Sequence, residues 1–275
     1  MGILFSLAAA VGYGASDFLA GVAGRRGAAA SVALLAEPFG LISALFGLWL
    51  IPWTGPTGSS LAWGALSGVG SGLGILFLYR GLAQGRMTVV APVAGILTAL
   101  IPAVVGLALG NRPGFIALAG MVIALPAVAL VSRQTGGGLS RSSGVPEALI
   151  AGVCFAVLFI ALDRAGTHSG TWPLVSGQLV AMLVIGAAAI QGRAVPMDWR
   201  RLAPLAMAAG VLGGVGNILF LSATGRGELA VVAVMASLYP AVTVLLARVG
   251  LGERMVAIQK VGLLMAAVAV VLISR

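Results

Sequence analysis

Long apolar segments alternate with short polar connections along the whole chain, and each segment ends at glycine, proline or a charged residue. A helix of about 20 apolar residues crosses the ~30 Å hydrocarbon core of a bilayer. Because the apolar segments reach that length again and again, the pattern predicts ten transmembrane helices. We place these helices at residues 3–22, 30–51, 61–82, 87–109, 114–132, 146–165, 172–191, 202–223, 228–249 and 255–274.

The pattern occurs twice. The run VVAVMASLYPAVTVLLARVGLGER (residues 231–254) has a counterpart, VVAPVAGILTALIPAVVGLALGNR (residues 89–112), which lies 142 positions earlier. A glycine- and serine-rich linker at 134–144 separates the fifth and sixth predicted helices. We therefore expect a first five-helix repeat at 1–133 and a second at 145–275. Because five is odd, the repeats enter the membrane from opposite sides, which predicts an all-α membrane protein with two inverted five-helix repeats.

The composition agrees with a membrane protein. The chain is 60% hydrophobic and 8% charged, whereas a soluble domain carries about 25% charged residues. Its net charge of +9 arises in short loops between helices, so membrane orientation and anionic lipids explain it better than nucleic acid does. With one cysteine, Cys154, and one histidine, His168, we expect no disulfide framework, no metal site, no catalytic histidine and no cofactor.

The basic residues are distributed unevenly. Twelve of the sixteen Lys and Arg residues lie in or near the loops that follow odd-numbered helices. Four lie in the loops after even-numbered helices or at the C-terminus. The positive-inside rule would therefore place both termini outside the cytoplasm.

Three stretches carry a family resemblance: YPAVTVLLARVGLGER (239–254), its weaker copy ending in GNR (110–112), and YGASDFLAGVAGRR (13–26). Through them, essentially the whole chain resembles the EamA-type ten-helix branch of the drug/metabolite transporter superfamily. The resemblance implies a bacterial inner-membrane carrier, often an exporter of amino acids, drugs or other small metabolites. It also implies a cavity surrounded by helices one, three, four, six, eight and nine, and cytoplasmic termini, which conflict with the arginine distribution. The first copy departs from the pattern, with Thr98 in place of the proline and Asn111 in place of the glutamate.

Two acidic residues lie inside predicted helices. Glu37 is near the middle of the second helix, where an acid is costly unless it is protonated, paired or facing water. We interpret Glu37 as a proton-coupling or cation-binding carboxylate; neutralisation by an arginine such as Arg80 is the alternative. Asp17, towards the end of the first helix, shares a face with Tyr13. These two residues either line a polar cavity or place an acid at the membrane interface.

Further polar residues are candidates for a substrate site. Arg80 and Tyr79 end the third helix, where Arg80 either reaches lipid headgroups or binds a substrate carboxylate. Asn217 and Gln178 either bond across helices or line a cavity. The remaining candidates are Tyr239 for binding, the prolines Pro38, Pro92, Pro102 and Pro240 for breaking or gating helices, and the glycines Gly64, Gly68, Gly72, Gly210 and Gly214 for helix packing.

The inverted repeats predict a secondary transporter that works by alternating access. The resemblance implies that it exports small metabolites, such as amino acids or drug-like compounds, across the inner membrane. Proton coupling is a hypothesis that depends on Glu37. An uptake carrier and a facilitative channel are the alternatives. The expected partners are a small-molecule substrate and the lipid bilayer, and the sequence is compatible with a monomer or a homodimer.

Overall fold

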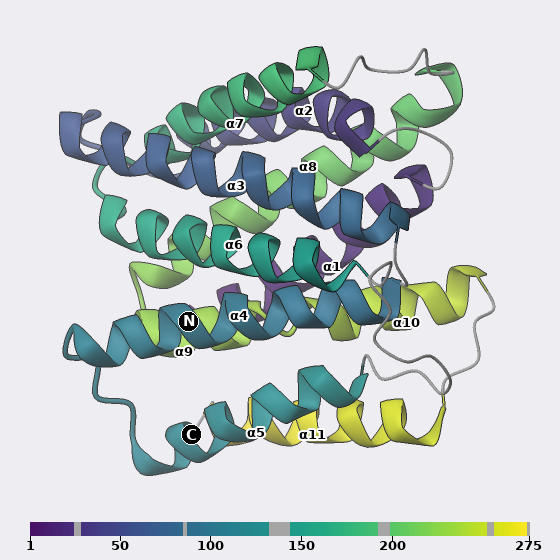
Figure 1. Cartoon of the computed structure of the whole chain (residues 1–275). Coiled ribbons are helices and arrows are strands. Elements are labelled where there is room, and N and C mark those ends of the chain that lie inside the picture. The colour runs from purple at the N-terminus through teal and green to yellow at the C-terminus, as the bar shows by residue number, and fades with distance from the viewer. Residues whose placement is uncertain (25–28, 85–86, 132–143, 192–198, 252–255, 274–275) are drawn as a thin grey trace.

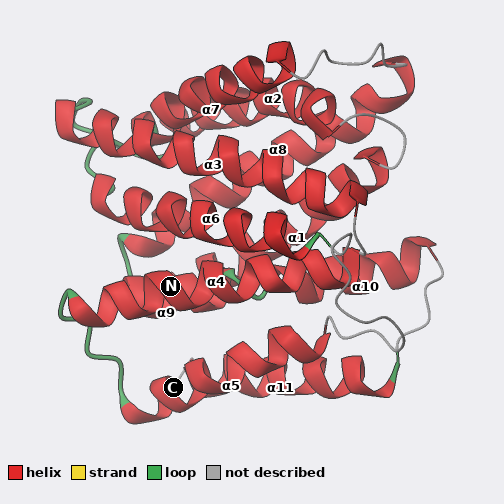
Figure 2. Ribbon diagram, viewed as in Figure 1, coloured by secondary structure: helices red, strands yellow, loops and turns green. Residues whose placement is uncertain are grey.

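The computed structural model describes residues 1–24, 29–84, 87–131, 144–191, 199–251 and 256–273. Within these ranges every regular element is a helix (Figures 1 and 2). The helices are α1 (Gly2–Gly24), α2 (Ala29–Leu50), α3 (Gly58–Gln84), α4 (Met87–Ala108), α5 (Phe115–Val131), α6 (Val145–Ala165), α7 (Trp172–Gln191), α8 (Trp199–Thr224), α9 (Leu229–Ala236), α10 (Tyr239–Leu251) and α11 (Ala257–Ile273).

The hydrophobic pattern predicted these helices well. With α9 and α10 counted as one span, the described elements form ten apolar segments. Seven of these segments are long and apolar enough to cross a membrane, and α4, α5 and α11 contain shorter apolar stretches. The helical form is expected, because a segment in lipid has to satisfy its backbone N–H and C=O groups internally.

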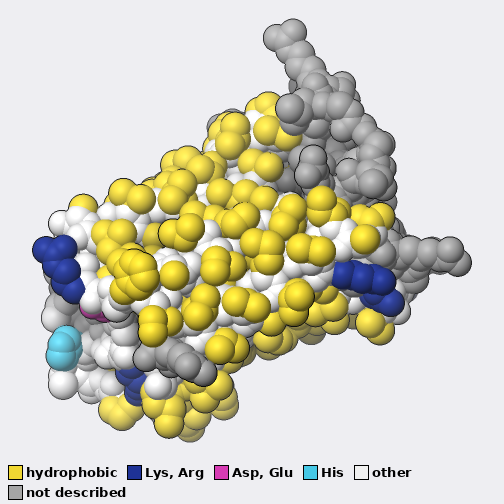
Figure 3. Space-filling model, turned by 90° about the horizontal axis from the view of Figure 1, so that it is seen from below, with side chains coloured by type: hydrophobic (Ala, Val, Ile, Leu, Met, Phe, Trp, Pro, Cys, Tyr) yellow, Lys and Arg dark blue, Asp and Glu magenta, His cyan; other side chains and the backbone are white. Residues whose placement is uncertain are grey.

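The outer surface of α5 and α11 is apolar. Figure 3 shows hydrophobic side chains covering the face formed by α5 and α11, with Lys and Arg side chains towards its two ends. Phe115, Val122 and Leu264 are among the large apolar residues exposed on these two helices. Lipid tails are the environment that such a surface requires, and the basic side chains lie where headgroups would be.

The helices pair across the two halves of the chain. α1 packs against α8, and α3 packs against α6 and α7. α2 contacts both α7 and α8, while α5 and α11 lie together at one edge (Figure 1). Each helix has a counterpart 142 positions away in the other half. When each helix is replaced by its counterpart, the contact of α1 with α8 becomes that of α6 with α3. The contact of α2 with α8 corresponds in the same way to that of α7 with α3.

Glycines make the closest of these approaches. The structure places all five glycines expected to pack helices at such contacts, with those of α3 facing α7 and those of α8 facing α2. A Cβ atom at Gly68 would overlap the carbonyl oxygen of Gly177, and one at Gly210 would overlap that of Ala36. Small side chains let two backbones meet where lipid gives no hydrophobic drive for association.

The ninth span is interrupted in its middle. α9 ends at Ala236, and Ser237 and Leu238 form a turn before α10 begins at Tyr239. Pro240 lies in the first turn of α10, where its missing N–H has no helical acceptor to lose. This is the one predicted proline that lies beside an observed break in the described helices.

The expectation that Pro38, Pro92 and Pro102 break their helices needs correction. α2 continues through Pro38, and α4 continues through Pro92 and Pro102. A proline removes one helical hydrogen bond, and membrane helices tolerate that loss when neighbouring helices support the segment.

Two hydrogen bonds join the halves at the end of the molecule where α1 begins and α11 ends (Figure 1). The backbone N–H of Arg112 donates to Glu228 Oε1 at 3.1 Å, and the backbone N–H of Ala230 donates to Asn111 Oδ1 at 3.1 Å. The second bond satisfies one of the free N–H groups at the start of α9. The turn after α4 is thereby tied to the start of the ninth span.

Candidate functional site

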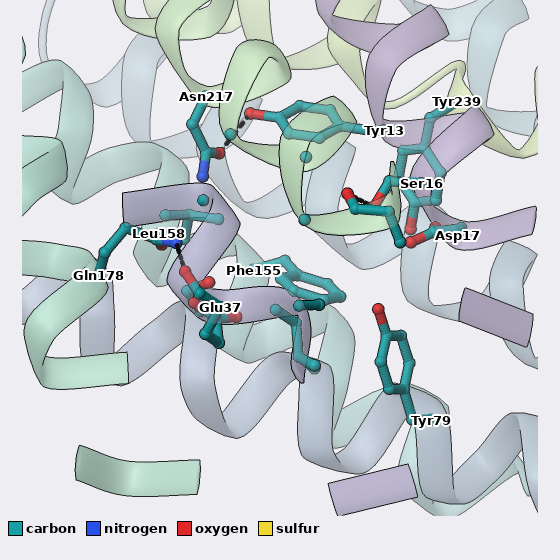
Figure 4. Close-up of a pocket in the computed structure, with 18 of the residues that line it drawn as sticks. Tyr13, Ser16, Asp17, Glu37, Tyr79, Phe155, Leu158, Gln178, Asn217 and Tyr239 are labelled. Carbon is teal, nitrogen blue, oxygen red and sulfur yellow. Dashed lines mark hydrogen bonds between the residues drawn. The ribbon is translucent and has the colours of Figure 1, made fainter. Parts of the chain in front are cut away.

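A cavity of about 90 Å³ lies inside the bundle (Figure 4). Its walls come mainly from α1, α2, α3, α6 and α8, with single residues from α4, α7 and α10. The family resemblance implied all of these spans except α2 and α7. Seven of the eight predicted binding candidates line the cavity: Tyr13, Asp17, Glu37, Tyr79, Gln178, Asn217 and Tyr239.

α1 contributes one polar face to the cavity. Ser16 and Asp17 follow Tyr13 by three and four residues, a spacing that places both of them next to Tyr13 on the surface of the helix. The Tyr13 hydroxyl donates to Asn217 Oδ1 at 2.8 Å, and the Ser16 hydroxyl donates to the carbonyl oxygen of Ala209 at 2.8 Å. Both bonds tie α1 to α8, so they fix the side of α1 that faces the cavity.

Replacing Tyr13 by Phe should destabilise the protein by about 1 kcal/mol, because Asn217 Oδ1 loses its donor in a half-buried position. Asn217→Ala should have a similar cost. The double variant should cost less than the sum of the two, by about 1 kcal/mol. The free energies of unfolding can be measured in mixed detergent micelles. Strictly additive costs would show that this hydrogen bond contributes nothing to stability.

Glu37 extends from α2 into the cavity and is 4% exposed. The Gln178 amide donates to the backbone carbonyl of Glu37 at 3.3 Å. The carboxylate atom Oε2 is buried and has no hydrogen-bond partner among the described residues. A buried carboxylate with an unpaired oxygen is costly, so Glu37 is the kind of acid that gains a proton or a bound cation.

Tyr239 lies at the break in the ninth span and is 4% exposed. Its hydroxyl oxygen has no hydrogen-bond partner in the described part of the chain. The first turn of α10 is held against α1 by the Thr243 hydroxyl, which donates to the carbonyl oxygen of Gly14 at 3.1 Å. The break therefore presents an unpaired hydroxyl to the cavity close to the polar face of α1.

Arg80 does not line the cavity, although Tyr79 beside it does. Arg80 is exposed near the end of α3. Its exposure agrees with the alternative in which Arg80 reaches lipid headgroups. Its binding of a substrate carboxylate stays a prediction.

Several lining residues were missed by the sequence reasoning. Ser16, Ser71 and Thr98 add hydroxyl groups, and Phe155 and Phe159 add aromatic rings. Serine, threonine and phenylalanine are common in membrane helices and do not stand out by composition. The repeat register was the signal that could have found the two rings, because Phe155 and Phe159 occupy the positions of Tyr13 and Asp17 in the second unit.

Comparison with known proteins identifies the class. The model of the EamA-like transporter family matches residues 142–275. A chain solved by crystallography superposes with a TM-score of 0.70 over 96% of this chain and 95% of its own length. Its sequence identity is 18%, so this likeness establishes the fold alone. No curated protein sequence matches the chain significantly.

These findings confirm the family resemblance for the second half of the chain. The protein is a multi-pass membrane protein, and its residues 142–275 match the model of the EamA-like transporter family. This is a family of membrane transporters rather than of enzymes.

Proposed function

We propose that the protein is a secondary transporter that carries a small solute through this cavity by alternating access. The observation that carries the proposal is the position of the cavity between the two halves of the chain. Six pairs of lining residues lie 142 positions apart, one from each half: Tyr13 and Phe155, Ser16 and Leu158, Asp17 and Phe159, Ala36 and Gln178, Ser71 and Gly213, and Ile75 and Asn217.

These pairs support two inverted five-helix halves at 1–133 and 145–275, joined by the linker at 134–144. A pseudo-two-fold axis in the membrane plane would bring equivalent residues to one central site. The exchange of helix contacts between the halves supports the same axis. In transporters built this way, one half rocks against the other around a fixed midplane site.

The two halves supply different chemistry to the site. Asp17 and Glu37 both come from the first half, while the equivalent positions in the second half carry Phe159 and Leu179. We assign proton coupling to Glu37, because it is the more deeply buried acid and its Oε2 has no partner among the described residues. A carboxylate that must take up a proton before it can stay buried links protonation to the conformation of the cavity.

The hydrogen bonds of Asn111 and Glu228 join the two halves at the end where α1 begins. Alternating access requires contacts between the halves that can break without unfolding either half. Two bonds between exposed or half-buried groups suit that requirement, since each has a net strength of about 1 kcal/mol. We propose that these two bonds form when the cavity is closed on the side of the membrane where α1 begins.

Expression in an efflux-deficient bacterium should lower the accumulation of at least one small solute, because we propose export across the inner membrane. The panel should include amino acids, amines and cationic dyes. Collapse of the proton gradient should abolish the effect. The matched control is the double variant Asp17→Asn/Glu37→Gln at equal membrane level, which should behave like the empty vector.

Reconstituted protein separates a carrier from a channel. A carrier should show saturable uptake into liposomes and acceleration by solute on the opposite side. Flux that stays linear with concentration and ignores solute on the other side would indicate a channel instead.

A further inference from the structure

The charged side chains in the described lining of the cavity are all acidic. Its described lining includes the carboxyl groups of Asp17 and Glu37 and contains no Lys, Arg or His. The basic residues whose side chains the structure describes are all exposed: Arg80, Arg112, Arg164, Arg200, Arg226, Arg248 and Lys260. A solute carboxylate in this cavity would therefore lie near two acids without a basic partner among the described side chains, which is strongly unfavourable in a low-dielectric interior.

Aromatic groups surround Asp17. Figure 4 shows Asp17 beside the hydroxyl ends of Tyr79 and Tyr239, with Phe155 on the side towards Glu37. The Tyr239 hydroxyl is buried and lacks a hydrogen-bond partner among the described residues, so it can accept an N–H from a bound group. Aromatic rings also attract cations through their faces. An ammonium group would find at this place a carboxylate, a hydroxyl acceptor and aromatic rings.

The same lining does not fit a metal ion. Within the described residues no three His, Cys, Asp or Glu side chains come together. Hard cations such as Ca²⁺ take six or more oxygen ligands, several of them carboxylates or carbonyls. The apolar and aromatic walls suit an organic body instead. The cavity of about 90 Å³ is smaller than the ~150 Å³ that accommodates benzene in an engineered protein, so this conformation has to widen for an aromatic solute.

We propose that the cavity binds a small organic cation, a protonated amine on an apolar or aromatic body, with its ammonium group on Asp17 beside Tyr79 and Tyr239. This inference rests on the proposed transport function and narrows its substrate class. Solutes whose only charge is a carboxylate are excluded. Amino acids bind more weakly than the corresponding amines because their carboxylate has no basic partner among the described lining residues.

Three solutes that share a phenylethyl body test this directly: 2-phenylethylamine, phenylalanine and 3-phenylpropionate. Their dissociation constants for the purified full-length protein in detergent can be measured by calorimetry. The amine should bind at least about tenfold more tightly than phenylalanine, and phenylpropionate should not bind. Asp17→Asn should weaken amine binding about ten- to a hundredfold. Asp17→Glu, which keeps the charge, should retain most of the affinity for the amine. Asp163→Asn, which removes an acid outside this cavity, should leave that affinity unchanged.

The outcomes are distinct. Equal or tighter binding of phenylalanine or phenylpropionate overturns the proposed substrate class, even if the protein transports them and the proposed function stands. Amine binding that depends on Asp17 but gives no transport of the amine into liposomes supports the site and contradicts the proposed function. Amine binding unchanged in a folded Asp17→Asn variant removes Asp17 from the site, and failure of all three solutes to bind overturns the inference.

Discussion

Gly68→Ala should cost the protein roughly 1–3 kcal/mol of stability, and Gly68→Leu should prevent folding. The added Cβ would overlap the carbonyl oxygen of Gly177, which belongs to the backbone of α7 and cannot rotate away. Relief would require α3 and α7 to move apart along a contact where Gly64 and Gly72 are also closely packed. Thermal stability in detergent, followed by size-exclusion chromatography of heated samples, measures the effect.

Gly186→Ala provides the matched control. Gly186 also lies inside a helix, α7, but a Cβ atom there meets nothing within 4 Å. Alanine favours the helix over glycine by about 1 kcal/mol, so this variant should be as stable as the wild type or slightly more stable. A Gly68→Ala protein as stable as Gly186→Ala would show that the two helices are not as close as the structure places them.

Gly210→Ala should repeat the effect of Gly68→Ala. Gly210 is the residue 142 positions after Gly68, and its Cβ would overlap the carbonyl oxygen of Ala36 in α2. Equivalent glycines thus make equivalent helix contacts in the two units. Positions that recur 142 residues apart therefore share helix contacts as well as hydropathy. This explains why the helices could be predicted from the sequence pattern.

The helices were predictable because the bilayer allows few alternatives. A segment such as α7 has to be helical over the thickness of the membrane, so its ends could be placed from hydropathy alone. The break at Ser237 and Leu238 was harder to place. Proline at position 240 signals a disturbance, yet α2 and α4 show that prolines also occur within continuous helices. Whether a proline ends a helix depends on the packing of its neighbours, which one sequence does not contain.

Most of the acidic, amide and tyrosine residues of the cavity could be predicted from the sequence, but their arrangement in space could not. Acids, amides and tyrosines inside apolar spans are costly in lipid, so Asp17, Glu37 and Asn217 stood out. The contact of Gln178 with the backbone of Glu37 joins helices from different halves and leaves no trace in either segment alone. Arg80 could be placed near the end of its helix for a related reason, because hydropathy gives the depth of a residue. Whether it meets lipid headgroups or a substrate depends on the rotation of that helix.

Glu37→Gln should abolish proton-driven transport while leaving the protein folded. Glutamine is close in shape to glutamate and carries no charge, so it fits the buried site without needing a proton. The variant cannot bind and release a proton as the cavity opens to either side, and the energy of the gradient is then no longer coupled to the solute. We expect the initial rate of uphill transport to fall at least about tenfold, which corresponds to the loss of about 1.4 kcal/mol of coupling.

Proteoliposomes with an imposed pH gradient and the amine as solute measure this rate. Exchange of labelled for unlabelled amine at equal pH on both sides should persist in Glu37→Gln, because Asp17 still provides the negative charge of the site. Glu147→Gln, at an acid in the first turn of α6 that does not line the cavity, should leave both rates unchanged.

Loss of exchange together with uphill transport in a folded Glu37→Gln protein would place Glu37 in solute binding rather than in coupling. Full uphill transport would show that the proton is carried elsewhere, and Asp17, with Tyr79 and Tyr239 beside it, would then be the acid to test. The separation of exchange from uphill transport thus decides whether Glu37 and Asp17 have different roles, one in proton coupling and the other in binding the solute.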